Sequence, residues 1–179
     1  MTLKINGTRQ AGRIPTVLAV GFLISVLGSG DAQAQTRTER FFDDWRVVCV
    51  ERDESPRQCS MTQTLVQNNP RRQVFRWLVG VNQEGEMVDI LNAPLGVLLG
   101  PGMEVSVEGE DPVTVAYNVC GRRWCQGPLP TSDEVRGRMT AGVPVHVVYS
   151  NARGQRLRME VTVRGYREAL NYLRSQIGK

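Results

Sequence analysis

The stretch WRVVCVERDESPRQCSMTQTLV, residues 45–66, decides the fold. Its first six residues alternate, which places Trp45 and Cys49 on the same face of an extended chain. Residues 53–56 (DESP) favour a turn, and a second β-rich segment begins at Cys59. Two such segments joined by a turn form an antiparallel hairpin, in which facing cysteines lie within the separation that a disulfide needs.

Short segments rich in β-branched and aromatic residues continue downstream, divided by clusters of glycine, proline and asparagine. We predict strands at Val74–Val81, Met87–Leu91, Val97–Leu99, Met103–Val107, Val113–Tyr117, Val143–Tyr149 and Arg156–Val163. This spacing is typical of antiparallel sheets. The expected fold is therefore mostly β, an antiparallel β-sandwich or barrel-like domain.

Two helices are expected beside the strands. Ser132 is an N-cap residue followed by acidic residues, which predicts a short helix ending near Gly142. The chain closes with a C-terminal helix whose apolar stripe should pack on the sheet. That stripe comprises Tyr166, Ala169, Leu170, Leu173 and Ile177. We expect residues 42–179 to form a single β domain, preceded by a flexible segment at 35–41.

The first 34 residues have the order of a secretory signal peptide. Three basic residues come first, Ile14–Leu27 carries no charge, and Ala32-Gln33-Ala34 offers small residues to a signal peptidase. A membrane anchor fits less well, because 14 residues of helix span about 21 Å against a hydrocarbon core of roughly 30 Å. We expect cleavage near Ala34 and a periplasmic or secreted mature protein with no integral membrane span.

The charge of the chain argues against a nucleic-acid partner. Removing residues 1–34 takes away three basic residues and one acidic one, so the net charge falls from +4 to +2. The remaining basic residues are interleaved with acidic ones, as in Arg52-Asp53-Glu54. A mixed, solvated surface is the better interpretation, and we expect no nucleic acid to bind.

All four cysteines lie in the expected mature chain, which in an exported protein predicts two disulfides. Sequence alone allows three pairings, of which we favour Cys49–Cys59 and Cys120–Cys125, because each pair brackets turn-forming residues. The spacings do not resemble the CxxC pairs of zinc sites. A redox role for Cys120 and Cys125 stays open, because two neighbouring arginines would lower a thiol pKa.

The loop between Cys120 and Cys125 is the one candidate binding feature. Arg122, Arg123 and Trp124 form a basic and aromatic tip that suits contact with an anionic or protein partner. A plain solvated turn is the alternative interpretation.

No catalytic or cofactor motif is present in the sequence. His146 is the only histidine and lies between apolar residues of a predicted strand. We therefore expect no catalytic residue, no metal and no cofactor.

Several motifs in order resemble the invasion-associated locus B family of exported bacterial proteins. They are W-x-x-x-C at 45–49, P-x-G-V at 94–97, the pair Cys120 and Cys125, and G-Y-x-x-A-L at 165–170. The resemblance extends from about Phe42 to Leu173. It implies an exported β-rich domain with a loose link to host-cell entry, and no catalytic residues. The family usually places a small residue and a glycine before the last cysteine, where this chain has Arg123 and Trp124.

These features together predict an exported, non-enzymatic binding or interaction protein. Its partner would be an envelope or host protein, with a role in host-cell invasion or envelope integrity. The alternative is a periplasmic thiol-redox or hydrolytic enzyme that uses an unrecognised site.

Overall fold

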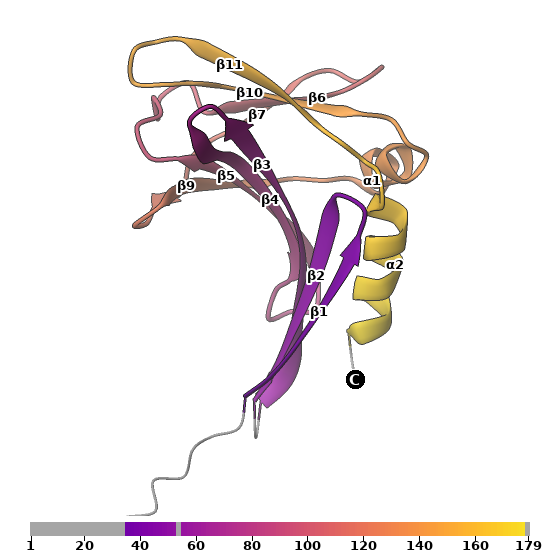
Figure 1. Ribbon diagram of the computed structural model, residues 1–179. Coiled ribbons are helices and arrows are strands. Elements are labelled where there is room, and N and C mark those ends of the chain that lie inside the picture. Colours follow the sequence, from indigo (N-terminus) through magenta and orange to yellow (C-terminus); the bar gives the residue numbers. More distant parts are fainter. Residues whose placement is uncertain (1–34, 53–54, 178–179) are drawn as a thin grey trace, which may run out of the picture. The chain divides into compact units, whose positions relative to one another are not determined.

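The computed structural model describes residues 35–52 and 55–177 of the 179-residue chain (Figure 1). The predicted signal peptide at 1–34 and its cleavage site near Ala34 lie outside the described residues. In the described part, neither helix combines the length and the apolar character that crossing a membrane requires.

The described chain forms two antiparallel sheets (Figure 1). The larger sheet has seven strands in the order β1-β2-β3-β4-β5-β9-β8. Their bounds are β1 Gln35–Phe42, β2 Trp45–Arg52, β3 Ser55–Asn68, β4 Arg71–Val81, β5 Met87–Pro94, β8 Val119–Cys120 and β9 Trp124–Leu129. The smaller sheet has four strands in the order β11-β10-β6-β7. Their bounds are β6 Met103–Val107, β7 Val113–Val115, β10 Val145–Ser150 and β11 Arg156–Val161.

Two helices complete the fold, α1 at Asp133–Thr140 and α2 at Tyr166–Gln176. The side chain of Ser132 accepts a hydrogen bond from the Val135 backbone N–H, so the predicted N-cap of α1 is formed. The prediction of a mostly β fold with a short helix and a C-terminal helix is confirmed.

The larger sheet has one buried face, which we call the inner face. On β2, Trp45, Val47 and Cys49 are buried, whereas the alternate residues remain partly accessible. Helix α2 packs against β2 and β3, and Figure 1 shows it alongside the β1–β2 hairpin. The hydroxyl of Tyr149 on β10 donates a hydrogen bond of 2.8 Å to the carbonyl of Val74 on β4. This hydrogen bond links the two sheets.

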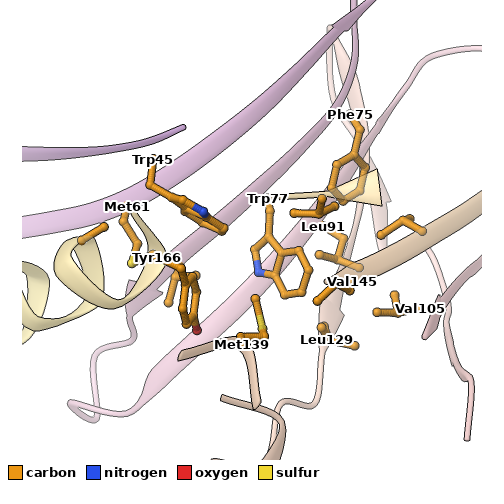
Figure 2. Packing of buried hydrophobic residues seen from close by; sticks show 14 of the residues in the cluster. Trp45, Met61, Phe75, Trp77, Leu91, Val105, Leu129, Met139, Val145 and Tyr166 are labelled. Carbon is orange, nitrogen blue, oxygen red and sulfur yellow. The ribbon is translucent and has the colours of Figure 1, made fainter. Parts of the chain in front are cut away.

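Aromatic rings occupy the centre of the core (Figure 2). Trp45 meets Trp77 at 6.4 Å between ring centroids and Tyr166 at 5.1 Å, both edge to face. Each such pair contributes about 0.5–1.5 kcal/mol beyond its area burial. Because Trp77 lies on β4 and Tyr166 begins α2, the two contacts hold helix and sheet together.

Glycine is required where α2 begins. Gly165 has φ of +75°, and a Cβ at this position would overlap the carbonyl oxygen of Phe42. An L-residue would be strained by the backbone angle and blocked by this contact. Gly165 therefore lets α2 start directly against the end of β1.

An ion pair is buried between α1 and the larger sheet. Arg136 of α1 pairs through Nη2 with the carboxylate of Asp89 on β5, and the side chain of Asp89 is fully buried. The indole N–H of Trp77 donates to the other oxygen of the same carboxylate at 2.8 Å. The carboxylate thus has one partner from α1 and another from β4, which offset much of the cost of burying its charge.

The structure differs from the sequence-based expectation for the segment 35–41. In place of a flexible segment, residues Gln35–Phe42 form β1 and pair with β2 over its whole length. The pattern did not reveal this strand because β1 lies at the sheet edge, where all but one of its residues are exposed. Its charged side chains are typical of an edge strand.

Two smaller predictions were wrong. Helix α2 ends at Gln176, and Ile177 is extended and 38% exposed, so Ile177 does not continue the buried stripe. Gln176 is buried in its stead. The predicted strand at Val97–Leu99 reduces to one bridge between Val97 and Asn151, with Leu98 and Leu99 exposed.

Replacing Asp89 with Ala should lower the free energy of unfolding by about 3–5 kcal/mol, because it leaves the Arg136 charge buried without a partner. The double variant Asp89→Leu/Arg136→Met should lose less, since no buried charge remains. Urea unfolding measures both. The control is Glu104→Ala, which breaks an exposed pair with Arg156 and should cost less than about 1 kcal/mol. Equal losses for Asp89→Ala and Glu104→Ala would contradict the assignment.

Candidate functional site

Both disulfides join residues that face each other across paired strands. Cys49 is bonded to Cys59 between β2 and β3, and Cys120 to Cys125 between β8 and β9. These are the pairings that the sequence favoured. In the second hairpin the Gly121 N–H donates to the Trp124 carbonyl at 2.8 Å, which closes a tight turn. The disulfide and this hydrogen bond together hold the loop that carries the predicted binding residues.

The loop forms one wall of a pocket of about 340 Å³. The other walls come from β4, β5 and β9, so the pocket lies on the accessible, outer face of the larger sheet. We call it the hairpin pocket. It is lined by Arg76, Asn92, Val119, Gly121, Arg122, Arg123, Trp124 and Gln126. The structure thus brings the three predicted loop residues together and adds residues from strands that lie far away in sequence.

Arg76 reaches the pocket because of strand alternation. Its neighbours Phe75 and Trp77 are buried on the inner face, so Arg76 emerges on the outer face. Asn92 lies opposite Arg76 in the register of β4 and β5. The Nη2 group of Arg76 donates to Asn92 Oδ1 at 3.3 Å, and Asn92 Nδ2 donates back to the Arg76 carbonyl at 3.2 Å. This reciprocal pair orients the guanidinium.

Trp124 holds the other side of the same guanidinium. The Arg76 Cζ atom lies 5.5 Å from the centroid of the Trp124 ring, within the range of a cation–π contact. Trp124 differs from Trp45 and Trp77, which are both fully buried. The only partly accessible tryptophan of the chain therefore belongs to the hairpin pocket.

The charged residues that line the hairpin pocket are all arginines. Burial, and after it the charge of Arg46, lowers the pKa of Arg76, although an arginine stays protonated at neutral pH. Arg46 itself pairs with Glu39 at 3.0 Å. Arg76, Arg122 and Arg123 take part in none of the ion pairs formed within residues 35–52 and 55–177. This arrangement favours an anionic ligand, because guanidinium groups bind carboxylate and phosphate oxygens through paired hydrogen bonds.

A larger pocket of about 660 Å³ lies where β2 and β4 end and where β3 and β5 begin. Aspartate, glutamate and histidine are absent from the lining of both pockets in the described part of the chain. His146 lies on β10, with Nε2 3.8 Å from a carboxylate oxygen of Glu160. Among the described residues no group of three or more histidine, cysteine or acidic side chains could hold a metal ion.

Sequence reasoning missed Arg76, Asn92 and Gln126 as pocket residues. Arg76 and Asn92 belong to strands that reach the hairpin only through the order of strands in the sheet, whereas Gln126 directly follows Cys125 on β9 of the hairpin itself. The sequence showed only a single arginine, Arg76, between the aromatic residues Phe75 and Trp77. This pattern places Arg76 on the outer face but does not show which residues lie beside it.

Comparisons with known proteins give a family match and a similar fold. The family model described as "Invasion associated locus B (IalB) protein" matches residues 45–174. Among solved structures, the fold is similar to the crystal structure of invasion associated protein b from Bartonella henselae, with a TM-score of 0.66 and 21% sequence identity. The similarity covers 77% of this chain and 96% of that one. Comparison with curated proteins gives no match.

Removing the hairpin disulfide should loosen the pocket while leaving the fold intact. The variant Cys120→Ala/Cys125→Ala should lose about 2 kcal/mol of unfolding free energy, since the closed loop is short. Trp124 should become more accessible, because its turn is no longer closed covalently. Acrylamide quenching of tryptophan fluorescence measures this change, with Trp124→Phe as the control that removes the signal. Unchanged quenching would show that the disulfide does not hold the pocket.

Proposed function

We propose that this chain, which belongs to the invasion associated locus B family, works outside the cytoplasm as a non-enzymatic binding protein. Its partner is an envelope or host-surface protein that contacts the hairpin pocket. Two disulfides support a location outside the cytoplasm, because such bonds persist in oxidising compartments. The expected signal peptide agrees with this location. An involvement in host-cell invasion or envelope integrity follows from the family name and is part of the proposal.

The observation that carries the proposal is the construction of the hairpin pocket. A disulfide fixes the loop, Asn92 and Trp124 orient Arg76, and two further arginines stand at the rim without an acidic partner in the described chain. Such preorganised aromatic and arginine side chains dominate the binding energy of many interfaces. A loop that served only as a turn would need none of these contacts.

A site-specific crosslinking experiment tests the proposal. Val119 lines the pocket and is 52% exposed. Replacing it with a photoreactive amino acid leaves every pocket arginine in place. The matched control is the same residue at Val113 on β7, which is 41% exposed and lines neither pocket. In intact cells Val119 should capture a defined partner that Val113 does not. Trp124→Ala should reduce this capture at least about tenfold, the effect of a loss near 1.4 kcal/mol.

The same proteins captured from Val119 and Val113, with no effect of Trp124→Ala, would contradict the proposed role of the hairpin pocket. The Trp124→Ala variant replaces a partly accessible side chain, so its fold is checked by near-ultraviolet circular dichroism of the buried Trp45 and Trp77.

A further inference from the structure

The geometry points to a phosphate monoester as the group that the hairpin pocket binds. This inference rests on the proposed binding role of the hairpin and assigns a phosphate ligand to the same pocket, in addition to the protein partner. The shared chemistry is a dianionic phosphate, whose source is either a soluble sugar phosphate or a lipid headgroup.

Positive charge is unbalanced at the hairpin pocket. Three arginines, Arg76, Arg122 and Arg123, are among its lining residues. None of them is neutralised by an ion pair within the described residues. A phosphate monoester carries close to two negative charges at neutral pH and offers three acceptor oxygens. It matches three fork-shaped donors better than a single carboxylate does.

The central arginine of the pocket, Arg76, is preorganised. Asn92 and Trp124 restrict Arg76 before any ligand arrives. Its Nε is buried and has no hydrogen-bond partner in the described part of the chain, so the protein does not fully offset the burial of this cation. An anion in the pocket would offset that burial through Coulomb attraction. Binding would also cost little side-chain entropy, because the guanidinium is already oriented.

The volume of the hairpin pocket fits a small phosphate ester. A volume of about 340 Å³ lies at the lower end of small-molecule sites. It exceeds the need of a phosphate group alone and leaves room for part of the organic body that carries it. Val119 and Gln126 supply neutral lining for that body.

Fluorescence titration of the purified mature protein tests the inference, because Trp124 is the accessible tryptophan and touches Arg76. The probes are inorganic phosphate, glucose 1-phosphate, and phosphatidylcholine vesicles with one-fifth phosphatidic acid. Acetate and glucuronate serve as the carboxylate counterparts. We expect saturable binding of phosphate probes, weakened by salt, with carboxylates at least about tenfold weaker. Binding only to the phosphatidic acid vesicles would identify the source as a lipid headgroup.

A matched pair of variants locates the binding. Arg122→Gln/Arg123→Gln should weaken phosphate binding at least about tenfold. Arg153→Gln/Arg158→Gln removes the same charge from exposed positions outside both pockets and should change the affinity by less than about twofold. All four arginines are exposed, so both variants should fold. Calorimetry on Trp124→Phe shows whether binding persists when the fluorescent reporter is absent.

Three results would overturn the inference: no saturable binding of any phosphate probe, carboxylates binding as tightly as phosphate, or equal losses in the two double variants. Its failure is distinguishable from failure of the proposed function. Crosslinking at Val119 that depends on Trp124, without phosphate binding, would leave a protein-binding hairpin that does not use phosphate. Phosphate binding with identical captures at Val119 and Val113 would leave the ligand site and remove the protein partner.

Discussion

The edge-to-face packing of Trp45 against Trp77 and against Tyr166 is the interaction on which the rest of the structure depends. It fixes which face of the seven-stranded sheet is buried, because β2 and β4 turn their tryptophans toward α2. Once that face is chosen, the two-residue period of a strand assigns every neighbouring side chain to the other face. Arg76 and Asn92 are therefore placed on the outer face by the same contacts that build the core.

The proposed binding surface lies on the outer face where the sheet ends in the β8–β9 hairpin. There the Cys120–Cys125 disulfide brings Trp124 over Arg76, and the exposed arginines of the loop extend the positive charge. A rigid sheet under a covalently closed loop is a favourable support for recognition, because little conformational entropy is lost when a ligand binds. The packing of the core and the disulfide thus together position the residues of the pocket.

Much of the fold follows from local patterns in the sequence. The alternation at 45–50 predicted the buried face of β2, and Ser132 predicted the start of α1. Strand β1 escaped prediction because an edge strand exposed on both faces has no apolar alternation. The loop part of the site was also visible, since Arg122 and Trp124 lie between two cysteines. Arg76 could not be predicted as a pocket residue, because the residues that lie beside it on the outer face depend on the order of strands. No local sequence pattern contains that order.

The measurement that tests the account most directly is a map of amide chemical-shift changes by nuclear magnetic resonance as inorganic phosphate is added. The account predicts that the largest changes fall on Gly121–Gln126, Arg76 and Asn92, at the hairpin pocket. Saturable changes concentrated on another surface, such as the exposed side of β11, would contradict the claim that this pocket is the phosphate site.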